Sequence, residues 1–233
     1  MSIAEKLVKI AENEQAVFEA GKAEGAKEEY DRFWEFVQPT NRTMFMYMFN
    51  YWDWEYGDPK KPIVIDNKNT GIVGMFYYCA KLKTINAEKF DFINVGVATN
   101  LFANCTSLEN VPKISLCCAN LTNAYANCYK LRTIGLVDVS RITVNNGLND
   151  TFKNCYALED IGEIRGQILQ NSLNLQGSTK LNQATFIRVV NALSDSEVGN
   201  SVTFSKVAKE SAFTDEEWAQ LIGTKPNWTI ALA

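Results

Sequence analysis

The chain has 233 residues, of which 46% are hydrophobic and 21% charged, and its formal net charge is −4. This composition is typical of a globular protein, and its scattered Lys and Arg residues form no basic stripe of the kind that binds nucleic acid. Charged residues interrupt the opening MSIAEKLVKIAENEQ, and no stretch approaches the ~20 apolar residues that span a bilayer. We therefore expect neither a signal peptide nor membrane insertion.

Histidine is missing from the whole sequence. This removes the commonest general base, the usual partner of a Ser or Cys nucleophile and the commonest transition-metal ligand. Asp and Glu are plentiful, so a glycosidase with two carboxylates remains formally open, but no pair stands out by its context. We therefore expect a protein that is not an enzyme and that has no cofactor and no metal.

Residues 1–37 are predicted to be helical and to serve oligomerisation or attachment. Apolar residues recur there at steps of four, three and seven, which is the spacing of a heptad seam. A seam this narrow, with charge on the other faces, favours a coiled coil between copies of the chain; packing on the rest of the same chain is the alternative. The seam consists of Ile3, Leu7, Ile10 and Val17.

Residues 38–71 are rich in aromatic side chains and are predicted to form an N-terminal cap. Within them Trp52, Trp54 and Tyr56 alternate with acidic residues, which would place the three rings on one face of an extended segment. An exposed row of this kind would stack against sugar rings and bind a ligand. The alternative is that the rings form the core of the cap and cover the open end of a repeat array.

One phrase occurs four times between residues 72 and 164: an aromatic residue, then Cys, Leu and a β-branched residue at steps of three. The four cysteines are 26, 23 and 27 residues apart, a period typical of leucine-rich repeats. We therefore expect an α/β repeat fold, a leucine-rich-repeat solenoid with short helices and parallel strands after the N-terminal helix. Its predicted core positions are Phe76, Cys79, Leu82, Ile85, Phe102, Cys105, Leu108, Val111, Tyr125, Cys128, Leu131, Ile134, Phe152, Cys155, Leu158 and Ile161.

Each phrase is expected to contain a short helix or tight turn up to its Leu and a strand after it, such as Leu108–Ile114 or Leu131–Val139. The four cysteines share one phase of the repeat, and no CxxC pair is present, so we interpret them as buried thiols and not as disulfides or metal ligands. The asparagines that precede three of them are predicted to bond to the local backbone.

Residues 165–233 are predicted to form a C-terminal cap that continues the solenoid. The expected elements are a strand at Leu173 to Leu175, a helix at Gln183 to Leu193 with Ile187 among its inward residues, a strand at Ser201 to Ser205, a capping box of Thr214 with Glu217 opening a helix to Ile222, and a strand at Trp228 to Leu232.

The copies MFYYCAKLKTI, LFANCTSLENV and TFKNCYALEDI resemble the leucine-rich repeats of bacterial surface proteins of the BspA type, over about residues 72–164. The opening MSIAEKLVKIAENEQAVFEAGKAEG and the closing TDEEWAQLIGTKPNWTIAL look like the ends of leucine-rich-repeat proteins encoded in phages and prophages of gut bacteria, among tail, baseplate or tail-fibre genes.

The resemblance implies a virion component that forms a homo-oligomer, with a trimer favoured, contacts other tail proteins and presents its repeats to a glycan or protein on the host cell. The expected location is the phage tail or, failing that, the bacterial cytoplasm or a cell surface reached by a non-classical route. A purely structural virion protein and a bacterial adhesin are the alternatives, and an enzyme grafted onto the repeats is a third.

Overall fold

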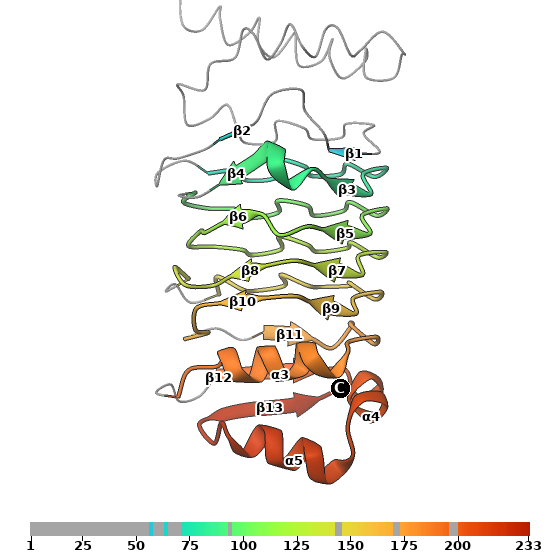
Figure 1. Cartoon of the computed structure of the whole chain (residues 1–233), viewed down its shortest axis with the longest axis vertical. Coiled ribbons are helices and arrows are strands. Elements are labelled where there is room, and N and C mark those ends of the chain that lie inside the picture. Colours follow the sequence, from blue (N-terminus) through green and yellow to red (C-terminus); the bar gives the residue numbers. More distant parts are fainter. Residues whose placement is uncertain are drawn as a thin grey trace, which may run out of the picture.

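In the computed structural model of the protein, the described part of the chain winds as a stack of coils (Figure 1). The structure describes residues 56–57, 63–64, 71–92, 95–142, 146–169, 173–195 and 200–233. The predicted coiled-coil seam (Ile3, Leu7, Ile10 and Val17), together with Trp52 and Trp54, lies outside these residues. We call residues 71–165 the repeat coils and residues 173–233 the C-terminal unit.

Two columns of short parallel strands run along the repeat coils. In the first column Val111 pairs with Ile134, and Ile134 with Ile161, so each residue lies opposite the same phrase position of the next coil. The first column consists of β1 (Tyr56–Gly57), β3 (Thr84–Ile85), β5 (Asn110–Val111), β7 (Thr133–Ile134) and β9 (Asp160–Ile161). The second consists of β2 (Ile63–Val64), β4 (Phe90–Phe92), β6 (Ser115–Leu116), β8 (Val137–Asp138) and β10 (Ile164–Arg165). A 3₁₀ helix, η1 (Ala87–Lys89), joins β3 to β4.

The segment from the aromatic residue to the Leu is a turn in every phrase, and the turns form a third face of the stack. Their backbones are bonded from coil to coil: the N–H of Phe102 donates to the carbonyl of Ala124 at 2.7 Å, and that of Tyr125 to Thr151 at 3.0 Å. This pairing satisfies polar backbone groups that burial would otherwise leave unpaired, so the turns hold the coils in register as the strands do.

Each turn contains two residues in the left-handed region, four positions apart. In the second coil they are Asn100 and Asn104, with φ of 57° and 64°, and in the third Asn123 and Asn127, with φ of 55° and 62°. Asparagine is among the few residues besides glycine that visit this region readily. The backbone of the turn therefore explains why asparagine recurs directly before cysteine.

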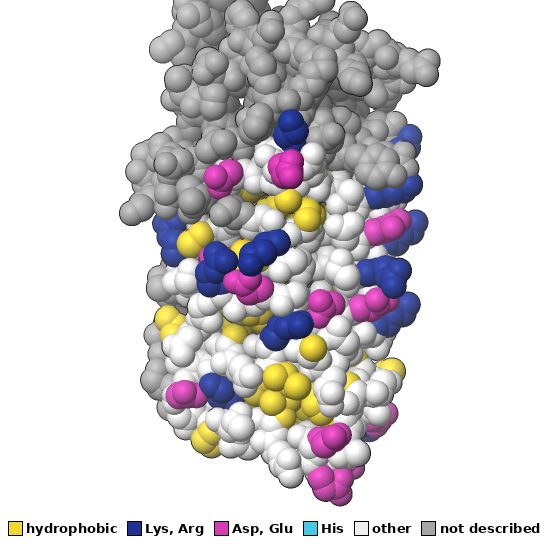
Figure 2. Space-filling view, viewed as in Figure 1, with side chains coloured by type: hydrophobic (Ala, Val, Ile, Leu, Met, Phe, Trp, Pro, Cys, Tyr) yellow, Lys and Arg dark blue, Asp and Glu magenta, His cyan; other side chains and the backbone are white. Residues whose placement is uncertain are grey.

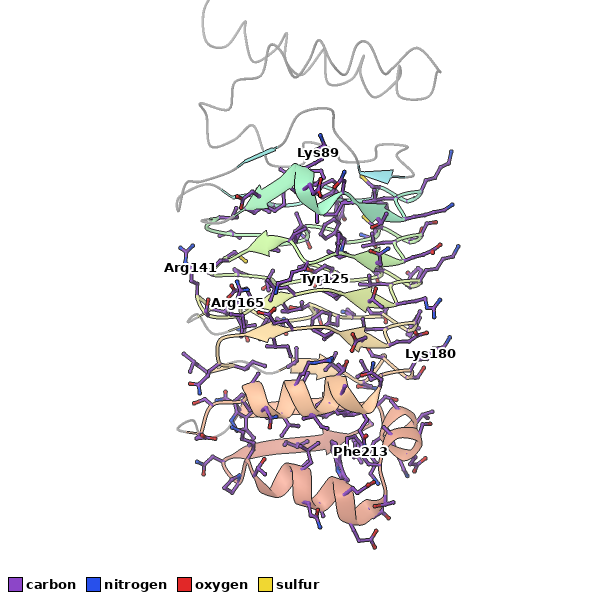
Figure 3. The ribbon with its side chains drawn as sticks, viewed as in Figure 1. Lys89, Tyr125, Arg141, Arg165, Lys180 and Phe213 are labelled. Atoms are coloured by element: carbon purple, nitrogen blue, oxygen red, sulfur yellow. The ribbon has the colours of Figure 1, made fainter. Side chains whose placement is uncertain are left out.

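The phrase residues point into the stack. All sixteen predicted core positions are at most 2% exposed. Their aromatic rings form a continuous ladder, with centroid distances of 4.9 Å from Phe76 to Phe102 and 5.7 Å at the next two steps, and with ring planes within 11° of parallel. Figure 3 shows Tyr125 inside the coils. A repeat that advances by pure translation brings like side chains together, and flat rings then stack.

The cysteines connect consecutive coils through hydrogen bonds. The Sγ of Cys105 donates to the carbonyl of Phe76 at 3.0 Å, and that of Cys128 to the carbonyl of Phe102 at 3.1 Å. All six cysteines of the chain are free thiols. Burial raises the pKa of the Cys155 thiol to about 12, which keeps it protonated and unreactive at neutral pH.

The single strand predicted at Leu131–Val139 is wrong, because the segment forms β7 and β8, which belong to different columns. Gly135 makes the corner between them, where a Cβ would clash with the backbone nitrogen of Lys113 in the preceding coil. The prediction for Leu108–Ile114 fails in the same way, with β5 ending before Pro112. Apolar residues alternate through both corners, so the sequence pattern does not reveal them.

The C-terminal unit is a three-stranded parallel sheet with helices (Figure 1). The capping box of Thr214 with Glu217 is confirmed, and the strand predicted at Trp228 to Leu232 is found with those bounds. One helix was not predicted, α4. The elements are β11 (Leu173–Leu175), α3 (Gln183–Ala192), β12 (Asn200–Phe204), α4 (Lys206–Ala212), α5 (Asp215–Gly223) and β13 (Trp228–Leu232).

Helix α3 takes the place of the next strand in the first column. The hydroxyl of Thr185 accepts from the N–H of Ile161 at 3.0 Å, and Arg188 donates to the Ile161 carbonyl at 2.8 Å, so side chains satisfy the edge of β9. Arg188 also pairs with Asp160 at 2.7 Å. Ile187, predicted to point inward, is 38% exposed because it lies outside the helix face formed by Phe186, Val189 and Val190.

Candidate binding surface

The turn face carries an exposed pair of tyrosines. Tyr129 and Tyr156 directly follow the cysteine in the third and fourth phrases, and they are 43% and 50% exposed. Their rings stack with centroids 5.9 Å apart and planes within 8° of parallel. Large aromatic side chains are usually buried, and those that remain at a surface frequently serve as contact residues for a ligand or partner.

A ladder of asparagine side chains runs beside the tyrosines. The Nδ2 of Asn154 donates to the Oδ1 of Asn127 at 2.7 Å, and the Nδ2 of Asn127 donates to the Oδ1 of Asn104 at 2.8 Å. The prediction that these side chains bond to the local backbone is therefore wrong. They bond to one another because identical positions of successive coils lie side by side.

The asparagine ladder also orients the tyrosine pair. The hydroxyl of Tyr156 donates to the Oδ1 of Asn154 at 2.9 Å, which fixes the ring in position. The ring of Tyr129 stacks on the ring of Tyr156 and lies nearly parallel to it. The pair is thus held by hydrogen bonds and stacking on a backbone that is itself bonded from coil to coil, so a ligand would meet a surface ordered in advance.

Charged side chains of both signs line one edge of the stack. Figure 2 shows Lys and Arg side chains along the right-hand edge of the stack with Asp and Glu between them, and Figure 3 shows Lys180 projecting from that edge. Lys130 directly follows Tyr129 in the chain and is exposed, whereas Lys180 lies two coils further along the stack. Arg132 and Glu159, one coil apart, form a two-pronged ion pair with distances of 3.2 and 3.1 Å, which contributes to coil register.

The ligand-binding residues predicted from sequence are placed only in part. Trp52 and Trp54 lie outside the described residues, and the backbone of Tyr56 pairs with Thr84 as the first strand of its column. The sequence reasoning did not identify Tyr129 and Tyr156. The available signal was the recurrence of NCYKL and NCYAL in the third and fourth phrases, which places one aromatic residue at the same exposed position in two successive coils.

The interior near the fourth coil contains a small cavity that is not suited to bind a polar ligand. A cavity of about 10 Å³ lies there, lined only by apolar side chains including Val139, Phe152 and Val189. This is the lower limit for one water molecule, which would find no polar partner, so the cavity is a packing defect. In the described part of the chain, no three potential metal ligands gather, and none of the helices is long and apolar enough to cross a membrane.

Comparisons with protein-family models, with curated proteins and with solved structures find no significant match to this chain. The chemical groups on the candidate surface are therefore the guide to its ligand. It combines aromatic rings, side-chain amides and ammonium groups on a rigid backbone. Rings that stack, amides that donate and accept, and cations that pair with carboxylates are the groups that recognise sugars and polar peptides.

Proposed function

We propose that this protein is a recognition protein without enzymatic activity, a leucine-rich-repeat solenoid of the BspA type that belongs to a phage tail or baseplate. Its repeat coils bind a glycan or protein on the host cell surface. The observation that carries the binding role is the exposed, stacked pair Tyr129 and Tyr156, oriented by the asparagine ladder. The assignment to a phage tail rests on the resemblance of the repeats and of both chain ends.

The rigidity of the stack supports this role. A side chain that is already ordered before binding loses little conformational entropy when it contacts a ligand. In the repeat coils the backbone of each turn is bonded to the next, and the exposed rings are bonded to that frame. Residues that served only to stabilise the fold would not need to keep aromatic surface in water.

Oligomerisation through the N-terminal helix would multiply this surface. In the proposed trimer three copies of the tyrosine pair act together, and binding of the first copy raises the effective concentration of the others. Weak single contacts with a repetitive cell surface then sum to firm attachment. Light scattering of the full-length chain tests this part: a trimer is expected, and a monomer at micromolar concentration would contradict it.

Adhesion of the labelled full-length protein to a panel of gut bacteria tests the binding role. The double variant Tyr129→Ala with Tyr156→Ala should lower adhesion at least tenfold while the circular dichroism spectrum stays unchanged. Val207→Ala is the matched control, because Val207 is 60% exposed on α4 and lies outside the repeat coils. If the intact oligomer adheres to no cell and binds no glycan, the protein is a structural part of the virion instead.

A further inference from the structure

The tyrosine pair is closed on one side and open on the other. Below Tyr156 the next coil carries Gly177, and a Cβ placed on that glycine would lie 3.6 Å from the Cε1 of Tyr156. The backbone thus covers that end of the pair. Beyond Tyr129, in the opposite direction along the stack, the same phrase position is held by Thr106, and by Ala80 in the coil before it.

Because threonine carries no ring, the exposed row of rings ends at Tyr129. We call the place that a third ring would take, beside the outer face of Tyr129, the space. The ring centroids of Tyr129 and Tyr156 are 5.9 Å apart, and the centroids of neighbouring rings in the buried ladder are 4.9 to 5.7 Å apart. A third ring at position 106 would continue the exposed row at the same step. Threonine is too short to fill it, and its hydroxyl donates toward the carbonyl of Ala80 at 3.4 Å, away from Tyr129.

The asparagine ladder ends beside this space. Each ladder amide donates to the preceding coil, but the first member, Asn104, has no asparagine before it, because Tyr78 occupies that position. Asn104 accepts from Asn127 through its Oδ1, and none of the described residues accepts a bond from its Nδ2. Asn104 precedes Thr106 by two positions, so this donor lies at the rim of the space and is available to an oxygen of a ligand.

The surroundings of the space are basic. The residues one position further along the coils are Lys81, Ser107 and Lys130 in the first three phrases, and both lysines are exposed. In all four phrases, the first and the second position after the cysteine are free of acidic residues. Glu109 is the nearest carboxylate along the second coil, in the row of Arg132, whose charge balances it in part.

We infer that the space between Thr106 and Tyr129 binds one ring of an acidic sugar. The ring lies on the outer face of Tyr129, its carboxylate pairs with Lys130, and the Asn104 amide donates to a ring substituent. A pyranose fits because its C–H groups pack on an aromatic face while its hydroxyl groups need amide and hydroxyl partners. The inference rests on the proposed recognition role and names the chemical class of its ligand.

Calorimetric titration of the full-length protein with sialyllactose and with lactose tests the acidic ring directly, since the two differ only in the acidic sugar. Tetragalacturonate and maltotetraose, an acidic and a neutral α-1,4-linked tetrasaccharide that also differ in configuration at C4, form a second pair. Each acidic ligand should bind at least tenfold more tightly than its neutral partner, and the difference should shrink as salt is raised. Equal binding within a pair would overturn the inference.

Three variants locate the site. Thr106→Tyr should fill the space by extending the row of tyrosines, so binding should fall at least tenfold while the melting temperature holds or rises. Lys130→Gln should remove the preference for the acidic ligand without changing the melting temperature. Lys180→Gln is the matched control, since Lys180 lies two coils away beyond the closed end, and it should bind as the parent does.

The two proposals fail in different ways. If the protein adheres to cells through Tyr129 and Tyr156 but binds none of the four oligosaccharides, the ligand is of another class, such as a protein, and only the acidic-sugar inference is wrong. Undiminished binding by Thr106→Tyr would likewise refute the site alone. If the protein neither adheres to cells nor binds any oligosaccharide, both proposals are wrong.

Discussion

The repeat coils and the C-terminal unit pack their aromatic rings in two different ways. In the coils Phe102, Tyr125 and Phe152 lie parallel to within 11°. In the C-terminal unit Trp218 meets Phe186 and Phe204 edge to face, at 85° and 87°. Both arrangements are favourable for aromatic quadrupoles. The difference shows that translation along the stack imposes parallel rings, whereas helices packed on strands impose no such constraint.

Polar groups follow the same division. In the coils, like residues pair with like, as in the asparagine ladder, and every coil depends on its two neighbours. In the C-terminal unit the bonds are individual: the indole N–H of Trp228 donates to the carbonyl of Ser194 at 2.7 Å, and buried Lys209 pairs with exposed Asp215. A substitution in the coils should therefore act on two interfaces, and one in the C-terminal unit on a single cluster.

The largest effect is expected from Cys128→Asp, which would place a carboxylate between the second and fourth coils, where Cys128 is fully buried. An unpaired buried charge costs several kcal/mol, so the chain should unfold or aggregate; Cys128→Ala should cost only about 1 to 2 kcal/mol. Circular dichroism melting measures both. Cys117→Asp is the control, since Cys117 is only partly buried. A melt of Cys128→Asp like that of the parent would contradict the inward position.

A smaller but still large effect is expected from Trp218→Ala. Trp218 is 7% exposed and contacts three phenylalanine rings, so its truncation leaves a cavity at the end of the core and should cost about 3 to 5 kcal/mol. Urea unfolding followed by tryptophan fluorescence and by circular dichroism measures it. Ile187→Ala, at an exposed apolar position of α3, should change the free energy of unfolding by less than ~0.5 kcal/mol.

The smallest effects are expected from two substitutions of Asn127, which together separate the contribution of the backbone conformation from that of the side-chain bonds. Asn127→Ala loses two amide bonds and forces alanine into a left-handed conformation, with φ of 62°, at a total cost of about 2 kcal/mol. Asn127→Gly loses the same bonds but accepts the conformation, so it should cost about 1 kcal/mol. Chemical denaturation measures the free energy of unfolding of both variants and thus shows which is less stable. Equal destabilisation by the two substitutions would show that backbone conformation contributes nothing at this position.

Sequence reasoning succeeded where a local pattern carries the information. The capping box at Thr214 and the bounds of β13 follow from a few neighbouring residues and are found as predicted. It failed at Gly135, where the chain turns between two columns while the apolar alternation continues. It also missed α4, whose N-cap is Ser205, because the predicted strand ran through that residue. Corners and short helices depend on what the preceding coil leaves room for.

The candidate surface shows the same limit. The sequence displays Tyr129 and Tyr156 at matching positions, but only their stacking and the bond from Tyr156 to Asn154 make them an ordered pair. The asparagines were visible too, and their partners were misjudged because those partners lie a full coil away. Contacts between residues 23 to 27 positions apart are invisible to a window that covers a single turn or strand.

By itself, the sequence determined the period, the composition of the phrase and the lack of histidine, and these already predict a repeat whose aromatic, Cys and Leu positions point inward. Each of these properties is local or additive along the chain. Only the tertiary structure decided which side chains of neighbouring coils meet: parallel rings inside, and an asparagine ladder with a stacked pair of tyrosines outside. Those contacts arise from the register between coils, which depends on all the strand and turn bonds together.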